Sequence, residues 1–192
     1  ERSQYVGEGA PNFSVGFMVD GIDFSGIGMP GMLFDMQQIE VFKGPQSSIY
    51  GSNAIAGLIN MTSTEPTPYI TGKSVISIGS DNQKLTGFAV GGPISNKLLF
   101  RFAMQKHNQN GYRNNVYKNL TNTNKRDELF SRIKFHWTIS PIVNLHFVSF
   151  NSNLNNGYDA WAVDNNKKIT TYSDEQGMDS QKSYSNSFKI NC

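Results

Sequence analysis

The sequence has little cysteine, little charge and no long apolar run, and each absence excludes a class of protein. A single cysteine, Cys192, in 192 residues allows no internal disulfide and no thiolate metal cluster. Charged residues make up 17% of the chain, and the 17 basic side chains are scattered, which excludes a nucleic-acid-binding patch. No stretch reaches the roughly 18 consecutive apolar residues of a membrane-spanning helix.

The residues that are abundant favour strands. The chain has 18 glycines, and 12% of its residues are aromatic, which is typical of short strands separated by turns. A mean hydropathy of -0.42 would ordinarily indicate a soluble protein. That inference fails for membrane strands, because they expose only alternate side chains to lipid and give a weak hydropathy signal. A mostly β protein is therefore expected.

The first third of the chain is predicted to be a compact α+β unit. Short β-branched or apolar runs at 17–19, 39–42 and 57–61 are each bounded by turn residues, as small buried strands are. Gly44 and Pro45 interrupt the second run, and residues 46–50 suit one helical turn that Gly51 ends. Pro66 and Pro68 then exclude both a helix and a central strand. We therefore expect a domain boundary here, with residues 1–65 before it and 66–192 after it.

Beyond this boundary, apolar and polar residues alternate with the period of a strand. Arg101 and Ala103 are expected on one face of a strand at 98–106, and Arg132 and Lys134 on one face of a second at 129–137. The opposite faces are apolar; they carry Leu98, Phe100, Phe102 and Met104, and then Leu129, Ile133, Phe135 and Trp137. Weaker patterns predict strands at 73–79, 84–90, 144–153 and 183–190.

The connections between these strands alternate in length. Those at 92–97 and 140–143 are short, whereas those at 108–128 and 154–180 are long and polar. Transmembrane barrels show this asymmetry, with tight turns on one side of the membrane and long loops on the other. A soluble sandwich has less reason for it, because both of its ends meet water.

One motif carries a family resemblance. The segment GFMVDGID at 16–23 is followed by DMQQIEVFKGPQSSIYGSNAIAGLINMTS at 35–63. This order is similar to the signature of TonB-dependent receptor plugs: a VDG strand, an acidic residue, an IEV strand, a KGP turn, a LYG-type turn, a Gly-rich stretch and an INI strand. Phe42, Ile49 and Ser52 depart from its usual residues. The matching residues, expected to have structural roles, are Asp20, Gly21, Ile39, Glu40, Lys43, Gly44, Pro45, Tyr50, Gly51 and Gly57.

The resemblance implies the C-terminal part of a plug followed by the first antiparallel strands of a transmembrane β-barrel. About six strands cannot close a barrel that in this family has about 22, so these residues alone are not expected to insert or transport. The parent protein would lie in the bacterial outer membrane, contact its lipid and import a scarce nutrient. That nutrient is typically a ferric siderophore, haem, cobalamin or an oligosaccharide, and a metal chelate, an iron–siderophore complex, is the one expected here. Its energy would come from the TonB-ExbB-ExbD complex, through a segment that precedes the plug; no cofactor is expected.

The resemblance also indicates where the imported ligand would bind. The stretch after the VDG strand corresponds to a plug apex loop, so Phe24, Ser25, Gly26 and Met29 are candidate substrate-binding residues, with a structural glycine-rich turn as the alternative. Glu40 and Lys43 either pair with the barrel wall or are solvated.

Other functions are weakly supported by the sequence. No nucleophile, base and orienting group can be placed together, and the three histidines lack ligand spacing, so neither an enzyme nor a metal site is predicted. A β-rich surface binding or adhesion protein remains the alternative. It would share the alternating strands but would not need the KGP-to-YG spacing.

Overall fold

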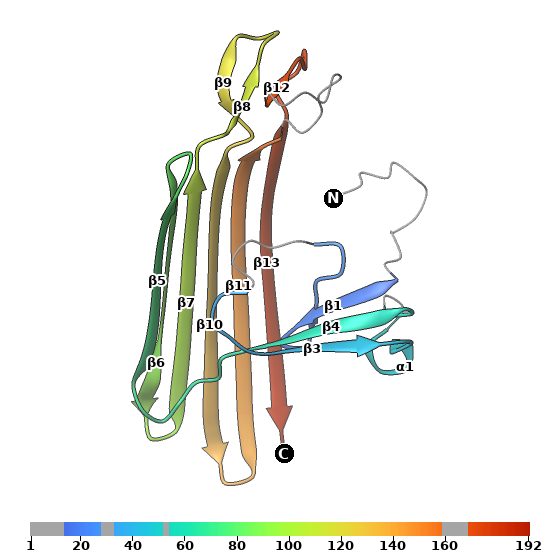
Figure 1. Ribbon diagram of the computed structural model, residues 1–192. Coiled ribbons are helices and arrows are strands. Elements are labelled where there is room, and N and C mark those ends of the chain that lie inside the picture. The colour runs from blue at the N-terminus through green and yellow to red at the C-terminus, as the bar shows by residue number, and fades with distance from the viewer. Residues whose placement is uncertain (1–13, 28–32, 52–53, 159–168) are drawn as a thin grey trace.

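The computed structural model describes residues 14–27, 33–51, 54–158 and 169–192. A small N-terminal sheet crosses one face of a long, curved sheet (Figure 1). The N-terminal sheet has the strand order β2-β1-β4-β3, with β1 parallel to β4 and the other pairs antiparallel. Its elements are β1 (Val15–Val19), β2 (Ile22–Asp23), β3 (Met36–Lys43), the single-turn helix α1 (Ser47–Tyr50) and β4 (Gly57–Ser63).

The long sheet has six strands in the order β13-β11-β10-β7-β6-β5, and every pair is antiparallel. The edge strands β5 and β13 do not pair with each other, so the sheet does not close. Its strands are β5 (Thr71–Gly79), β6 (Gln83–Ser95), β7 (Leu98–Gln109), β10 (Arg126–Ser140), β11 (Val143–Gly157) and β13 (Met178–Asn191). The predicted fold class, a partial α+β unit followed by about six antiparallel strands, is confirmed.

A third sheet lies beyond one end of the long strands. It consists of β8 (Arg113–Asn115), β9 (Leu120–Thr123) and β12 (Thr170–Thr171), in the order β12-β8-β9. The sequence predicted long loops in these regions, and the prediction missed this sheet. Its strands are short and rich in Asn and Thr, and β12 pairs with β8 from more than 50 residues away, as Thr170 opposite Asn114 shows. Neither feature produces a local alternating pattern.

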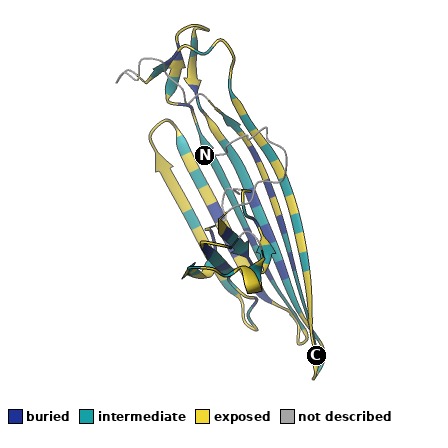
Figure 2. Cartoon of the chain, turned by 90° about the vertical axis from the view of Figure 1, so that its right-hand side faces the viewer, coloured by how far each residue is buried: buried dark blue, intermediate teal, exposed yellow. Residues whose placement is uncertain are grey.

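The two faces of the long sheet differ as the alternation predicted. On the face that meets the N-terminal sheet, Arg101, Ala103, Arg132 and Lys134 are all buried. On the other face, aromatic rings form a row across neighbouring strands, and Phe188 at its end is 69% exposed. Figure 2 shows the resulting alternation of burial along the strands. Paired residues of this row are Phe100 with Phe135, Phe135 with Phe147, and Phe147 with Phe188.

Apolar side chains join the N-terminal sheet to the long sheet in two clusters. The first contains Val19, Phe24 and Met61 from the N-terminal side and Phe130, Val148 and Phe150 from β10 and β11. The second contains Phe34, Ala89 and Ala103, with Val75 packed against it. Burial of these surfaces holds the two sheets together. Among the described residues, no helix is long and apolar enough to cross a membrane.

Candidate functional site

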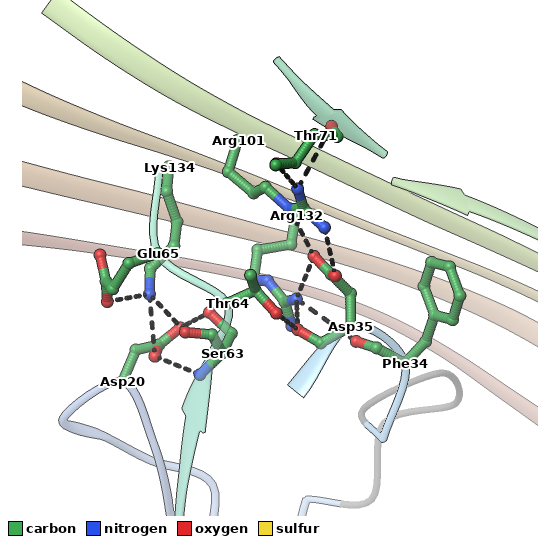
Figure 3. A network of polar contacts seen from close by, with 10 residues as sticks. All are labelled: Asp20, Phe34, Asp35, Ser63, Thr64, Glu65, Thr71, Arg101, Arg132 and Lys134. Carbon is green, nitrogen blue, oxygen red and sulfur yellow. Dashed lines mark hydrogen bonds and ion pairs between the residues drawn. The ribbon is translucent and has the colours of Figure 1, made fainter. Parts of the chain in front are cut away.

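Between the apolar clusters, charged side chains from the two sheets meet in one polar network (Figure 3). Its carboxylates come from the ends of N-terminal elements: Asp20 follows β1, Asp35 precedes β3 and Glu65 follows β4. Asp20 and Asp35 both have left-handed backbones, with φ of 49° and 59°, in turns where such a backbone suits aspartate. The cations come from the long sheet, namely Arg101 of β7 and Arg132 and Lys134 of β10.

Asp35 is the centre of the first part of the network. Arg101 donates two parallel hydrogen bonds to its carboxylate, from Nε to Oδ2 at 3.0 Å and from Nη2 to Oδ1 at 2.6 Å. Arg132 donates from Nη2 to the Asp35 carbonyl oxygen at 2.8 Å and lies 3.5 Å from its Oδ2. The Asp35 side chain is 2% exposed, that of Arg101 is 5% exposed and that of Arg132 is 1% exposed. Such bidentate, water-excluded contacts are among the strongest polar interactions in proteins.

Lys134 is the centre of the second part. Its Nζ contacts Asp20 Oδ1 at 3.2 Å, Glu65 Oε1 at 2.6 Å and the Ser63 carbonyl oxygen at 3.2 Å. Asp20 also accepts bonds from the backbone N–H and the hydroxyl of Ser63. Lys134 and Asp20 are buried, whereas the Glu65 side chain is 48% exposed. The second part is therefore the more open to solvent.

Charge in this network is balanced and divided between the sheets. Three carboxylates lie on the N-terminal side and three cations on the long sheet. Removing one of the buried carboxylates by mutation would leave a buried cation without its partner, which commonly costs about 3–5 kcal/mol. The network thus fixes how the N-terminal sheet lies on the long sheet and resists its departure.

A tightly packed aromatic ring lies next to Asp35. Phe34 rests on small residues of the long sheet, and we call the surface formed by Val75, Gly87, Ala89 and Ala103 the Phe34 socket. A Cβ added at Gly87 would come within 3.1 Å of the Phe34 ring and 2.9 Å of Val75 Cγ1. Lys73 Nζ lies 5.8 Å from the centre of the same ring. A side chain at position 87 would therefore force the Phe34 ring and Val75 to shift.

Replacing Gly87 by valine should therefore displace Phe34. Overpacking of this kind typically costs about 1–3 kcal/mol. We expect the urea concentration at the midpoint of release of the N-terminal sheet to fall. Adding Phe34→Leu to the Gly87→Val chain should restore part of the lost stability, because leucine is smaller than phenylalanine. Gly79→Val is the control, because its nearest neighbour is the flexible side chain of Gln83. Equal stability of the Gly87 and Gly79 variants would contradict the packing described above.

The predicted substrate-binding residues lie in varied surroundings. Phe24 is 4% exposed and packs edge-to-face on Phe150, with ring centres 5.5 Å apart, so its ring is part of the core. The Ser25 hydroxyl accepts a bond from the Phe17 N–H at 3.0 Å, and Gly26 has a φ of 74°. Met29 lies outside the described residues. Of the described members, Phe24, Ser25 and Gly26, none forms a hydrogen bond or ion pair with the six charged residues of the network.

The signature residues mostly shape turns of the N-terminal sheet. Gly21, Gly44 and Gly51 have φ of 79°, 91° and 90°, a backbone conformation that residues with a side chain rarely adopt. At Gly57 an added Cβ would lie 2.7 Å from the Phe42 carbonyl oxygen. Glu40 accepts a bond from the Asn60 amide at 2.9 Å, within this sheet. The remaining positions flank α1 or line β3: Ile39, Lys43 and Pro45 are exposed, and the Tyr50 ring lies 6.2 Å from Phe42.

Five network residues were not singled out from the sequence as site residues. Of the six, only Asp20 was named, as part of the signature. A signal was present for Arg101, Arg132 and Lys134, since each is a cation on the inner face of a strand whose other face is apolar. Asp35 had a weaker signal, an acidic residue between Phe34 and Met36.

Comparisons with known proteins show similarity to one family of receptors. Residues 1–58 match the family model of the TonB-dependent receptor plug domain. The chain is 30% identical over 89 residues to the pesticin receptor of Yersinia pestis, covering 46% of this chain and 13% of that protein. It is 34% identical over 95 residues to the vitamin B12 transporter BtuB of Vibrio vulnificus, covering 45% and 15%. The chain thus spans a small part of these relatives.

Solved structures show the same fold over most of the chain. The ferric yersiniabactin uptake receptor FyuA of Yersinia pestis superposes with a TM-score of 0.80 at 17% identity, covering 93% of this chain and 29% of that one. The outer-membrane ferripyoverdine receptor of Pseudomonas aeruginosa gives 0.64 at 14% identity, covering 91% and 25%. With the plug motif, the small sheet and the unclosed long sheet all in place, residues 1–58 belong to the plug-domain family of TonB-dependent receptors, and the chain as a whole has the fold of the corresponding part of such receptors.

Proposed function

We propose that the parent protein of this chain is an importer in which the N-terminal sheet acts as the plug and the long sheet as part of the barrel wall. The plug would end at residue 65 and the wall would begin at residue 66. The parent protein would bind a scarce nutrient at the outer face and pass it inward when the plug moves. The observation that carries this proposal is the balanced network of three carboxylates and three cations between plug and wall.

This network suits a gate better than a permanent joint. A permanent joint gains more from apolar packing, because a buried ion pair contributes little net stability over apolar residues of similar size. Ion pairs are directional, and water can solvate both sides once they separate. Ion pairs of this kind hold the plug in one orientation on the wall. They can separate and re-form when an outside force supplies the energy needed to break them. We propose that TonB, driven by ExbB and ExbD, supplies that force.

The proposed substrate is an iron–siderophore complex. Support comes from the relatives' names: two solved structures with this fold are described as a ferric yersiniabactin uptake receptor and a ferripyoverdine receptor. A vitamin B12 transporter is also among the sequence relatives, so cobalamin is the alternative substrate. No bond chemistry is required of the protein in either case.

Uptake measurements test the proposal. The full-length receptor would be expressed in cells that lack their own siderophore receptors, and entry of radiolabelled iron would be followed with a panel of ferric siderophores and, separately, with labelled cobalamin. We expect iron entry with at least one siderophore and its loss when tonB is deleted. Binding without TonB-dependent entry of any of these ligands would instead favour a surface binding or adhesion protein.

A further inference from the structure

We propose that the N-terminal sheet and the long sheet together bind a phosphorylated small molecule in a cavity between them, and that the bound molecule stabilises their closed arrangement. Three observations support this site: a row of nitrogen-bearing side chains across three neighbouring strands, a cavity that the row faces, and donors in the row that lack partners. Binding here can be measured without import, so the site does not depend on the proposed function.

The row consists of His136 on β10, His146 on β11 and Lys189 on β13. His136 lies directly opposite His146, and His146 lies directly opposite Lys189. The two imidazole rings stack with their centres 4.2 Å apart. Each of the three side chains can donate an N–H bond, and a neutral imidazole still has one N–H. Donors held side by side on rigid strands can bind one anionic group at a low cost in ordering.

All three members of the row line a cavity between the two sheets. Its volume is about 790 Å³, which falls within the range of about 300–1,000 Å³ that binds small-molecule ligands. On the opposite side of the cavity, α1 contributes Tyr50 and β4 contributes Asn60. A single phosphate ion would leave most of this space empty, so we infer that the ligand also has an organic part.

The row has donors to spare among the described residues. His136 Nε2 is buried without a hydrogen-bond partner there, and no ion pair joins Lys189 to a carboxylate in the same part of the chain. The carboxylates that line the cavity, Asp20 and Glu65, both contact Lys134 instead. A buried donor without a partner destabilises a fold, and an anionic oxygen would supply the missing bond.

The composition of the row favours phosphate over carboxylate. Carboxylates are bound best by the planar fork of arginine, as Asp35 is by Arg101 in this chain. Lysine instead binds phosphate as a point charge. A phosphate group also has more oxygen atoms than a carboxylate to share among three donors. A phosphorylated molecule therefore fits both the donors and the volume of the cavity.

The row lies close to the short turn between β10 and β11, at the end of the long sheet where the C-terminus also lies (Figure 1). Short turns face the periplasm in outer-membrane barrels, so the ligand would enter from that side. It would contact Tyr50 and Asn60 on one side and Lys189 on the other. Because both sheets contribute contacts, the bound ligand would oppose their separation.

Calorimetry and urea titration of the full-length receptor in detergent test the site. The probes are glucose 6-phosphate, adenosine monophosphate and inorganic phosphate, with glucose as the uncharged control. Lys189→Gln removes the charge from the row. Lys182→Gln is the matched control, because Lys182 is on the same strand but on its opposite face, outside the cavity lining. Zn²⁺ is titrated separately, since two histidines also suit a metal ion.

We expect at least one phosphorylated probe to bind and glucose not to bind. Lys189→Gln should raise the Kd of that probe at least about tenfold, the loss expected for a hydrogen bond from a charged group. Lys182→Gln should leave the Kd unchanged. At about ten times its Kd, the probe should lower the equilibrium constant for release of the N-terminal sheet about elevenfold, because only the closed arrangement binds it.

Equal Kd values for the Lys189 and Lys182 variants would overturn the proposed site. So would binding of Zn²⁺ alone, or no binding of any phosphorylated probe at millimolar concentration. A phospholipid headgroup is the other source of phosphate, so the urea titration is repeated in phosphatidylcholine nanodiscs with and without phosphatidylglycerol. Stabilisation by phosphatidylglycerol in place of the soluble probes would contradict a small-molecule ligand. A receptor that imports nothing would count only against the proposed function.

Discussion

Replacing Asp35 by asparagine is expected to loosen the plug more than any other single polar change in this chain. Asparagine keeps the shape but not the charge, so Arg101 and Arg132, which are at most 5% exposed, would be left without a carboxylate. Removal of one partner from a buried ion pair costs about 3–5 kcal/mol. In the full-length receptor, urea should therefore release the plug at a clearly lower concentration.

The release can be followed with a fluorophore on Ser47→Cys, an exposed position in α1, in the Cys192→Ser background. Asp174→Asn is the matched control, because it removes the same charge from an exposed loop position. The Asp35→Asn receptor should also admit large hydrophilic antibiotics that the unmodified receptor excludes. Equal urea midpoints for the Asp35 and Asp174 variants would show that the network does not hold the plug.

Replacing Phe24 by alanine is expected to destabilise the plug by a similar amount. Its ring is 4% exposed and packs on Phe150 within the larger apolar cluster. Truncating a buried phenylalanine costs about 3–5 kcal/mol through lost burial and the cavity left behind. Tyr69→Ala is a suitable control, since Tyr69 is 64% exposed.

This variant also separates two accounts of Phe24. The sequence suggested that its ring stacks on the imported ligand, whereas its burial favours a role in the core. We expect lower stability in urea and unchanged ligand affinity for the fraction that remains folded. Normal stability together with weaker ligand binding would support the substrate-binding prediction instead.

The sequence predicted the long sheet well because each strand carries its own information. Alternation of apolar and polar residues at 100–103 and at 132–135 predicts which side chains face inward, and this prediction needs no information from the rest of the chain. The strands nevertheless extend beyond the predicted limits; β10, for example, runs from Arg126 to Ser140. Near the end of β7, Gln105 and Lys106 are polar on both faces, so the alternation fades while the hydrogen bonds continue.

The charged network was harder to predict because its pairs are distant in the chain. Asp35 and Arg101 are 66 residues apart, and Asp20 and Lys134 are 114 apart. Composition and periodicity can mark a cation as inward-facing, yet they cannot say which carboxylate it meets. The partner depends on how the N-terminal sheet crosses the long sheet, which follows from packing such as that of Phe34 on Gly87.

The central claim is that ion pairs between plug and wall hold the plug in place, and a double-mutant cycle on Asp35 and Arg101 tests it most directly. The urea-dependent free energy of plug release would be measured for the parent, Asp35→Asn, Arg101→Met and the double variant, all with the fluorophore at position 47. Contacting residues couple by about 0.5–3 kcal/mol, and this buried bidentate pair is expected in the upper half of that range. Additivity of the two changes to within about 0.5 kcal/mol would contradict the claim.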